Sequence, residues 1–365
     1  MPLNDPFSHE SQRRRQSVLK HGMLPNSKIP SKKQITPQKT HKVSNVRNNK
    51  NIKVVIQNKL KPVNHPENQD RPSKVFMNVV EGIKTKVELP ELGSFNAGLA
   101  IYDEHKYVCV YRRDEYSFVG CLLDKKLQVC EKYFHKFHNF YVADPRLIWI
   151  NDSQLLMVYA TVQNDVEYIE GSIILDKKRF PVFLNNKPFR ISPSNLHERQ
   201  KNWMPFVHEE KIYLIASVCP HVIYELKIFP HIECQKVFET HWEHPWPVRL
   251  GLRGNTNPVL LDDGNYLATF HTSQYHNNIC HYDNGCYVFE GKPPFKVLSC
   301  SNRTYLPAES AVEKHFRKEG LIKCIFPVGM VKENKDVLIS YGENDSVVKI
   351  LRTKISDLVN LTVSV

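Results

Sequence analysis

One acidic side chain stands among several basic and amide side chains at positions that a repeated sequence pattern makes equivalent. Asp144 precedes Pro145 at the start of an apolar run, and similar runs elsewhere begin or end with residues that bind anions or hydroxyl groups. Arg and Lys neutralise phosphate, Asn and Asp bind sugar hydroxyls, and Trp can stack on a sugar ring. The set therefore predicts a site for an anionic or sugar ligand. Its members are Asn96, Arg112, Arg113, Asp144, Arg146, Lys201, Asn202, Trp203, Arg253, Asn257, His271 and Tyr341.

The small number of carboxylates in this set limits the chemistry. Glycoside hydrolysis by two carboxylates requires acids on both sides of the bond to be cut, and only Asp144 stands at such a position. Phosphate is already a nucleophile and has only to be held, whereas water needs a base to deprotonate it. One acid with a phosphate-binding set is therefore typical of phosphorolysis or glycosyl transfer. Further acids that could approach Asp144 in the fold are Asp262, Asp263, Asp283 and Glu343.

Each of these residues also has a purely structural interpretation. An Asp before Pro commonly opens a turn, and Trp203 can be a core residue. His221, in the segment SVCPH, and His271, in TFHTS, can be core histidines with satisfied hydrogen bonds. The remaining histidines lack the tight spacing of metal ligands, and no dinucleotide, P-loop or nucleophile-elbow motif is present. We therefore expect no metal and no cofactor, with phosphate or a sugar nucleotide as co-substrate.

The elements that must position these residues are five predicted β-hairpins. Each combines an apolar run, a tight polar turn and a second apolar run, and each opens with a residue before Pro, or before Ala in the first. The distance from that Pro or Ala to the end of the second run stays within a narrow range across all five. The hairpins begin at Asn96, Asp144, Met204, Asn257 and Phe326.

The spacing of the hairpins predicts the fold. Successive starts are 48, 60, 53 and 69 residues apart, enough for a four-stranded blade with variable loops. We therefore predict an all-β protein, a five-bladed β-propeller over residues 76–365, whose central channel is rimmed by the hairpin openings. The alternative is a β-sandwich with coincidental hairpins. Only the segment from Glu309 to Glu319 has the pattern of a helix.

The first 75 residues differ in composition from the rest. They hold 16 Lys or Arg against 4 Asp or Glu, which accounts for the whole net charge of +12, and their only aromatic residue is Phe7. Such a segment buries too little apolar surface to offset the entropy of ordering. We predict a disordered basic tail over residues 1–75, either a solvated or targeting extension or a segment that binds nucleic acid, anionic lipid or an import receptor.

The sequence also bears on cellular location. No apolar run of about 18 residues occurs, and no hydrophobic stretch follows the N-terminal basic residues. We therefore expect a soluble, intracellular and cytoplasmic protein without a membrane span. The nine cysteines form no CxxC pair, and most lie in apolar runs. They are typical of buried thiols in a reducing compartment.

Several motifs in order resemble one family. The segments ADPRLIWI, QKNWMPFVHEEKIYLIASVCPH, RGNTNPVLLDDGNYLATFHTS and FPVGMVKENKDVLISYGENDSVVKI are similar to successive blade motifs of the β-mannoside phosphorylases and the related β-1,2-mannosyltransferases. The resemblance extends from about Phe95 to Lys349. It implies a five-bladed propeller in which an Asp of a DPR-type motif is the single general acid and basic residues hold phosphate.

The resemblance also implies roles for individual residues. Asp144 would be the proton donor, acting directly or through a sugar hydroxyl, and Ala143 stands where the family often has Glu. Two Arg that help to hold phosphate in the phosphorylases have no clear match here. The implied phosphate ligands are Lys201, His221 and Arg253, and the residues implied to lie close to the sugars are Asn202, Asn257 and His271.

The sequence thus predicts an enzyme that transfers or phosphorolyses a glycosyl unit, by resemblance a mannosyl unit, with inversion. Its partners would be an oligosaccharide or a sugar phosphate. Two alternatives remain open, a propeller that binds glycans or proteins without chemistry, and an inverting glycoside hydrolase.

Overall fold

The computed structural model describes residues 80–89, 94–137, 141–163, 166–177, 182–183, 188–193, 200–246, 251–276, 279–308, 310–313 and 321–365. All of these belong to one compact unit, Asn68–Val365. The predicted disordered tail, residues 1–75, lies outside the described residues, and its boundary stays a prediction.

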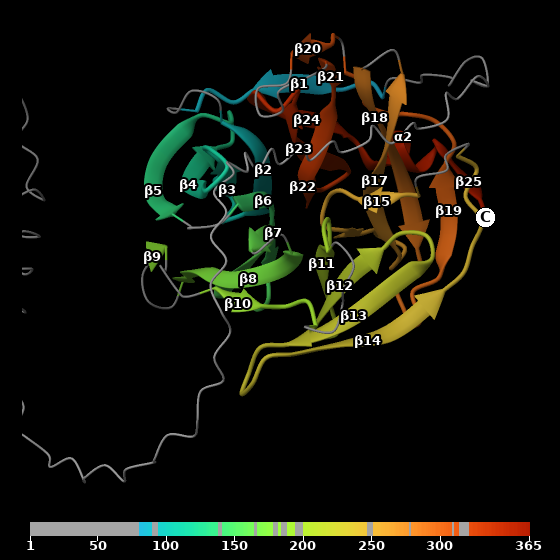
Figure 1. The fold of residues 1–365 in the computed structure, drawn as a ribbon, viewed down its shortest axis with the longest axis horizontal. Coiled ribbons are helices and arrows are strands. Elements are labelled where there is room, and N and C mark those ends of the chain that lie inside the picture. Colours follow the sequence, from blue (N-terminus) through green and yellow to red (C-terminus); the bar gives the residue numbers. More distant parts are fainter. Residues whose placement is uncertain are drawn as a thin grey trace, which may run out of the picture. The chain divides into compact units, whose positions relative to one another are not determined.

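Five β-sheets are arranged as the blades of a propeller around a common centre (Figure 1). The predicted β-propeller fold is confirmed, and the alternative of two stacked sheets is wrong. In blades I and III each strand pairs with the next one along the chain, whereas in blade II the last two short strands both pair with the third strand. Blade I contains β2 (Phe95–Ile101), β3 (Lys106–Arg112), β4 (Ser117–Asp124) and β5 (Val129–Phe137). Blade II contains β6 (Tyr141–Trp149), β7 (Gln154–Gln163), β8 (Val166–Asp176), β9 (Val182–Phe183) and β10 (Phe189–Arg190). Blade III contains β11 (Met204–His208), β12 (Lys211–Ser217), β13 (His221–Lys227) and β14 (Glu233–Thr240).

Blades IV and V complete the ring and depart from a simple four-strand pattern. The inner strand of blade IV is divided in two, and short strands from later in the chain extend this blade. Blade IV contains β15 (Arg253–Gly254), β16 (Val259–Leu260), β17 (Tyr266–His276), β18 (Ile279–Phe289), β19 (Val297–Ser301), β20 (Val312–Glu313), β21 (Leu321–Lys323) and β25 (Thr362–Ser364). Blade V contains β22 (Ile325–Glu333), β23 (Asp336–Glu343), β24 (Val347–Lys354) and β1 (Ile83–Lys86).

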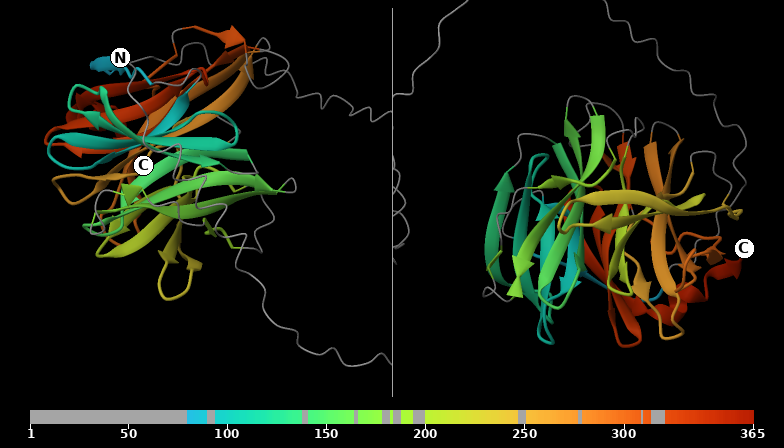
Figure 2. Two further views of the ribbon diagram at one scale, coloured as in Figure 1. Left: turned by 90° about the vertical axis from the view of Figure 1, so that its left-hand side faces the viewer. Right: turned by 90° about the horizontal axis from the view of Figure 1, so that it is seen from below.

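The ring is closed by a strand from the other end of the chain. β1 pairs antiparallel with β24, from Ile83 opposite Arg352 to Lys86 opposite Lys349, and Figure 2 shows the blue β1 against the red strands of blade V. The last blade is therefore built from both ends of the propeller sequence. Backbone hydrogen bonds thus hold the segment that precedes blade I to the last blade.

The five predicted hairpins form the inner two strands of the five blades, all antiparallel. Three of the predicted openings differ from expectation, because they are bulges within the strand instead of turns before it. The ladder is interrupted between Phe95 and Gly98, between Ala143 and Arg146, and between Pro327 and Gly329. A bulge redirects the side chains beside it, and this determines where the polar residues at these openings point.

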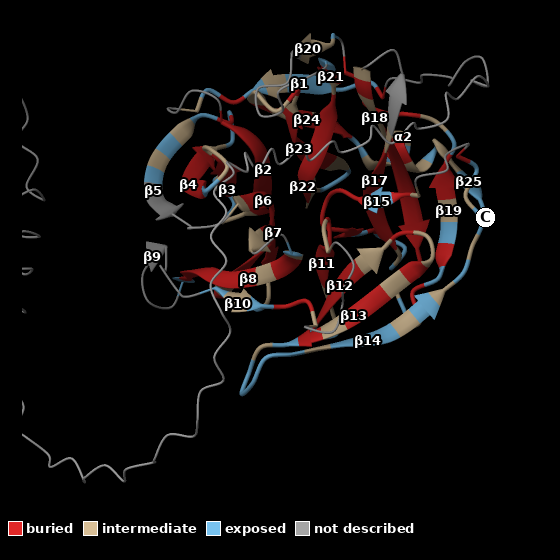
Figure 3. Cartoon of the chain, viewed as in Figure 1, coloured by how far each residue is buried: buried red, intermediate tan, exposed pale blue. Residues whose placement is uncertain are grey.

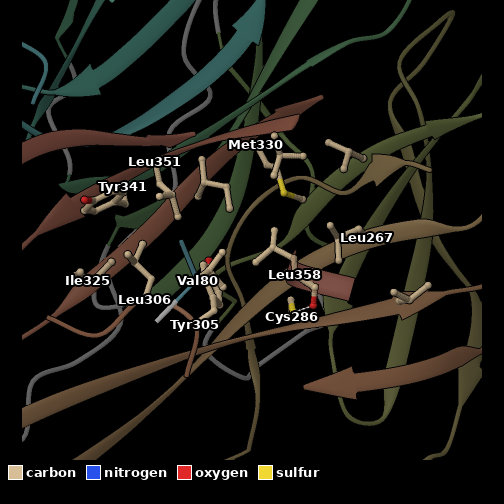
Figure 4. Close-up of a cluster of buried hydrophobic side chains, with 14 of the residues drawn as sticks. Val80, Leu267, Cys286, Tyr305, Leu306, Ile325, Met330, Tyr341, Leu351 and Leu358 are labelled. Atoms are coloured by element: carbon tan, nitrogen blue, oxygen red, sulfur yellow. Dashed lines mark hydrogen bonds between the residues drawn. The ribbon is translucent and has the colours of Figure 1, made fainter. Parts of the chain in front are cut away.

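The hydrophobic core lies between neighbouring blades. Inner strands are almost wholly buried, whereas the outer strand β14 is largely exposed (Figure 3). Between blades IV and V, Met330, Tyr341 and Leu351 pack with Cys286 and Leu358 (Figure 4). Fully burying such a side chain stabilises a fold by about 1.5–3 kcal/mol. Six of the nine cysteines are buried, in agreement with the prediction for most of them.

Helical structure is scarce in the described residues. The predicted helix from Glu309 to Glu319 falls mainly outside them, and its described part includes strand β20. A short helix that was not predicted, α2 (Ile355–Val359), follows β24 and packs Leu358 into the core. No described helix has the length and apolar character needed to cross a membrane.

Candidate active site

Two bulges place an amide and a carboxylate side by side. Asp144 lies in the bulge of β6 with φ of 56°, and Asn96 lies in the bulge of β2 with φ of 50°. Asp and Asn tolerate this left-handed conformation better than other residues with a Cβ. The Nδ2 atom of Asn96 donates a hydrogen bond to Oδ1 of Asp144 at 3.1 Å, and Asp144 is only 2% exposed. The predicted convergence of hairpin openings is thus realised between blades I and II.

Arg146 holds this bulge against blade IV. Its guanidinium donates to the carbonyl oxygens of Asp144 at 3.1 Å and Gly254 at 3.4 Å, and also to that of Asn255. Burial lowers the pKa of Arg146 to about 10, an effect that the neighbouring Asp144 opposes. Because its donors bind backbone carbonyls, Arg146 positions the strands that carry the site. Its predicted contact with a ligand gains no support.

Positive charge converges on His271. Arg253 lies directly opposite His271 in the ladder between β15 and β17, and cross-strand partners share one face of a sheet. Arg253, Arg146 and Lys201 all lower the pKa of His271, after burial as the main cause. Residues 201–202 approach blade IV closely, because a Cβ added at Gly254 would lie 2.5 Å from the carbonyl oxygen of Asn202. Three predicted ligands, Lys201, Arg253 and His271, are therefore brought together.

His271 itself is tightly held. Its ring stacks on Tyr282 with centroids 5.2 Å apart and 1° between the planes, and the edge of Phe326 packs against it. Nδ1 of His271 lies 2.6 Å from Oδ1 of Asn255. Asn255 was not predicted as a site residue, since its neighbour Asn257 stands at the hairpin opening.

Three predicted or candidate site residues have buried polar atoms without a hydrogen-bond partner among the described residues. Oδ1 of Asn96 is buried and has no hydrogen-bond partner among the described residues. The same is true of Nε of Arg112, whose guanidinium lies over the rings of Phe95 and Tyr141, and of Oδ1 of Asn202, which has φ of 64°. Leaving such an atom unsatisfied costs about 1–3 kcal/mol. A ligand rich in hydroxyl groups could satisfy these atoms.

Sequence reasoning did not single out Asp345, a second acid that acts on two of the same side chains as Asp144. Asp345 and Asp144 both contribute to raising the pKa of the Tyr282 phenol and that of the Cys324 thiol, although burial is the main cause for each. Asp345 lies in the β23–β24 turn, where it and Asn344 both have positive φ. The signal that could have found it is the pair Asn344-Asp345, whose residue types favour such a turn.

The four acids that were considered as second carboxylates have other contacts. Asp262 pairs with Lys332, and Glu343 pairs with Lys349. Asp263 accepts two hydrogen bonds from Asn265 within its own turn, and Asp283 accepts one from Thr304 at 3.2 Å.

Two of the predicted ligand residues are packed into the core. Trp203 is buried between blades II and III and packs against Tyr224 with ring centroids 4.8 Å apart. Its Nε1 donates a hydrogen bond to Gln200 at 3.1 Å. Trp203 therefore offers no free ring face to a sugar. Tyr341 lies in the apolar cluster of Figure 4.

Two further predicted ligands have their polar atoms satisfied by the protein. Nδ1 of His221 lies 2.9 Å from the carbonyl oxygen of Phe295, and Nε2 lies 3.5 Å from the Tyr287 hydroxyl. Asn257 links blades IV and V through two hydrogen bonds to Met330. Its Nδ2 donates to the carbonyl oxygen of Met330 at 2.9 Å, and its Oδ1 accepts from the backbone N–H of Met330 at 3.2 Å. Their predicted ligand contacts gain no support from this geometry.

The solved structures that resemble this chain share its fold. A protein from Parabacteroides distasonis described as a glycoside hydrolase is 15% identical and has a TM-score of 0.53, covering 78% of this chain and 95% of its own. The β-1,2-mannobiose phosphorylase from Listeria innocua is 14% identical with a TM-score of 0.53, covering 74% and 92%. A third structure, 12% identical with a TM-score of 0.53 and covering 73% and 85%, comes from work describing family 130 glycoside hydrolases that target β-1,2-mannosidic linkages in Candida mannan.

Sequence comparison extends this likeness to most of the chain. No curated protein matches it. The sequence profile of glycoside hydrolase family 130, described as β-1,4-mannooligosaccharide phosphorylase, matches residues 65–364. That range includes every blade and each residue of the site described above, and the order of motifs agrees with the resemblance seen in the sequence. The chain therefore belongs to glycoside hydrolase family 130, a family of carbohydrate-active enzymes that act on mannosidic linkages.

Proposed function

We propose that this chain is an inverting β-mannoside phosphorylase in which Asp144 is the general acid. The observation that carries the proposal is the position of the Asp144 carboxylate. Asn96 donates a hydrogen bond to this carboxylate, and Arg146, on the same strand as Asp144, bonds to the backbone carbonyl of Asn255. Lys201 and Arg253 contribute positive charge at His271. These contacts support a proposed site that combines a proton donor with cations able to hold an anion.

The proposed reaction is a single displacement. The protonated Asp144 carboxyl gives its proton to the glycosidic oxygen, directly or through a sugar hydroxyl, while that oxygen leaves the anomeric carbon with the bonding electron pair. A phosphate oxygen forms the new bond to the opposite face of the same carbon. The products are α-mannose 1-phosphate and the shortened sugar, and phosphate requires no base. Run in reverse, the same step extends a mannoside from mannose 1-phosphate.

Asp144→Asn tests the role of the proton donor. The amide preserves size and can still bond to Asn96, but it cannot release a proton. We expect a loss of about 10²–10⁴-fold in turnover, the usual contribution of a general acid. Turnover would be measured as mannose 1-phosphate formed from β-1,2- and β-1,4-linked mannobiose with inorganic phosphate.

Asp263→Asn is the matched control, because Asp263 lies in an exposed turn and its hydrogen bonds to described residues stay within that turn. It should leave turnover unchanged. Undiminished activity of Asp144→Asn, with the fold intact by circular dichroism, would disprove the role of Asp144.

A second candidate, hydrolysis, is favoured by carboxylates near the predicted anion site. Glu167 lies 3.9 Å from Lys201 and competes with phosphate for this cation, and Asp345 lies near enough to Asp144 for both to act on Tyr282. An inverting hydrolase needs such a second carboxylate as the base for water. Free mannose released at an undiminished rate without phosphate would favour this candidate.

The same assay separates two further alternatives. A chain that uses a sugar nucleotide would release the nucleoside diphosphate from GDP-mannose in the presence of an acceptor sugar. A propeller without chemistry would bind mannosides by calorimetry and release no product under any of these conditions.

A further inference from the structure

A chain of two buried side-chain amides begins at the backbone of blade V and its neighbouring loop. Nδ2 of Asn284 donates to the carbonyl oxygen of Ile325 at 2.9 Å and to that of Leu306 at 3.4 Å. A backbone carbonyl can only accept a hydrogen bond, so the nitrogen of Asn284 must face these two oxygens. This leaves Oδ1 of Asn284 directed at Asn255.

The second amide then has only one possible orientation. Asn255 is 3.0 Å from Oδ1 of Asn284, which accepts, so the nitrogen Nδ2 of Asn255 must be the donor. Oδ1 of Asn255 is therefore the atom that meets Nδ1 of His271 at 2.6 Å. Because that oxygen can only accept, the proton of the pair must be on Nδ1 of His271. Asn255, Asn284 and His271 are all buried, so water cannot readily replace any of these bonds.

The charges around His271 keep the other ring nitrogen unprotonated. Arg253 on β15, Arg146 on β6 and Lys201 before β11 are the charged groups that act on the ring, and Tyr282 on β18 stacks against it. Phe326 on β22 is apolar. A proton on Nε2 would create a buried imidazolium beside three cations, and burial together with these cations lowers the pKa of His271 well below its ordinary value. Nε2 therefore carries a lone pair.

We propose that Asn255 and Asn284 are positioning residues that fix His271 as the Nδ1–H tautomer, so that Nε2 accepts a hydrogen bond from phosphate bound as its monoanion. The choice of phosphate as the ligand rests on the proposed function. A P–OH group donates to Nε2, while Lys201 and Arg253 neutralise the unprotonated oxygens. The dianion has no proton to donate, so its oxygen would face the lone pair of Nε2 and be repelled. No bond is made or broken in this binding step.

The tautomer is tested without any ligand. Nitrogen NMR of the full chain labelled with ¹⁵N-histidine distinguishes protonated from bare ring nitrogens, and His271→Gln identifies the resonances of His271. We expect a protonated Nδ1 and a bare Nε2 in the wild type. Asn255→Leu should produce a mixture of the two tautomers. A protonated Nε2 in the wild type, or an unchanged spectrum in Asn255→Leu, would overturn the positioning role.

The preference for the monoanion is tested by calorimetric titration with inorganic phosphate. In the wild type, affinity should fall by about tenfold for each pH unit above the second pKa of phosphate, because the monoanion disappears at that rate. In Asn255→Asp the carboxylate stabilises a protonated imidazole, whose Nε2 becomes a donor. Its affinity should therefore persist above the second pKa of phosphate.

Asn302→Leu is the control for these titrations, because Asn302 is exposed and is not itself one of the hydrogen-bonded residues of the amide chain. It should keep the wild-type pH profile. A merely structural role of Asn255 would weaken phosphate binding equally at all pH values, and that result would overturn the monoanion preference. Absence of phosphate binding at every pH would overturn the proposed phosphorolysis, whereas a correct NMR tautomer would then still support the role of Asn255 and Asn284.

Discussion

The two buried histidines His221 and His271 have different surroundings, and these determine which of their ring nitrogens remain available to a ligand. Both are held in the neutral form by burial. His221 is surrounded by Tyr287, Phe289 and the carbonyl oxygen of Phe295, so both of its nitrogens are satisfied inside the protein. His271 is instead flanked by cations and by an amide that binds only one of its nitrogens. The sequence contexts SVCPH and TFHTS do not distinguish these environments, because they are created by other blades.

The burial of His221 has a consequence for stability. Its pKa falls from 6.5 to about 4 on folding, so the unfolded chain binds the proton more readily between these values. The stabilising contribution is complete above pH 6.5 and is lost as the pH falls toward 4. At about 1.36 kcal/mol for each pKa unit, the full effect is about 3 kcal/mol.

His221→Gln removes this titration. Urea unfolding followed by tryptophan fluorescence at pH 7 and pH 5 should show a smaller loss of unfolding free energy on acidification in the variant than in the wild type. The other histidines are common to both proteins and cancel in the comparison. An identical pH dependence would show that His221 is not held neutral in the fold.

At the scale of single elements, the hairpins could be predicted and their bulges could not. The pattern of apolar runs and polar turns located the inner two strands of every blade, because alternation and turn chemistry are local properties of the sequence. A bulge depends on the partner strand as well, so Asn96 and Asp144 appeared to open strands that in fact continue through them. For the same reason Trp203 and Tyr341 were predicted as ligands, although neighbouring blades cover them.

The bulge that carries Asp144 requires a glycine on the neighbouring strand. A Cβ added at Gly98 would lie 2.1 Å from the carbonyl oxygen of Pro145, a distance at which the backbone must move. Gly98→Ala should therefore displace the Asp144 bulge and lower kcat strongly, besides destabilising the fold. The measurement is kcat for mannoside phosphorolysis together with the midpoint of thermal unfolding.

Gly251→Ala serves as the comparison for Gly98→Ala. Gly251 has φ of 74° and no neighbour within contact distance of an added Cβ, so the cost is local backbone strain of about 1–2 kcal/mol. We expect it to lower the unfolding midpoint with little change in kcat. Equal effects of both substitutions on kcat would mean that the approach of Gly98 to Pro145 does not position Asp144.

At the scale of the whole molecule, the ring depends on β1. This strand covers the outer edge of β24 and ties the first part of the propeller sequence to its last blade. The family resemblance and the hairpin count predicted a closed ring, but the strand that closes it could not be predicted. Its sequence, IKTK, is short and mostly exposed, so it lacks a clear apolar pattern.

Two truncations separate the tail from the closing strand. Removal of residues 1–75 should leave mannoside phosphorolysis and thermal stability unchanged, because the propeller keeps β1. Removal of residues 1–86 also deletes β1 and exposes the hydrogen-bonding edge of β24, so the unfolding midpoint should fall and aggregation should increase. Loss of activity after removal of residues 1–75 alone would show that the tail contributes to catalysis.

The residues of the proposed site are distributed over the whole ring, and on the proposed function this links catalysis to assembly. Asn96 comes from blade I, Asp144 from blade II, Lys201 from the segment before blade III, Arg253 from blade IV and Asp345 from blade V. No blade holds enough of these groups to act alone. The first and last of these residues, Asn96 and Asp345, are about 250 residues apart in the chain. On the proposed function, recovery of enzymatic activity in a refolding chain would therefore report the final meeting of all five blades, a step that the recovery of β-structure alone does not reveal.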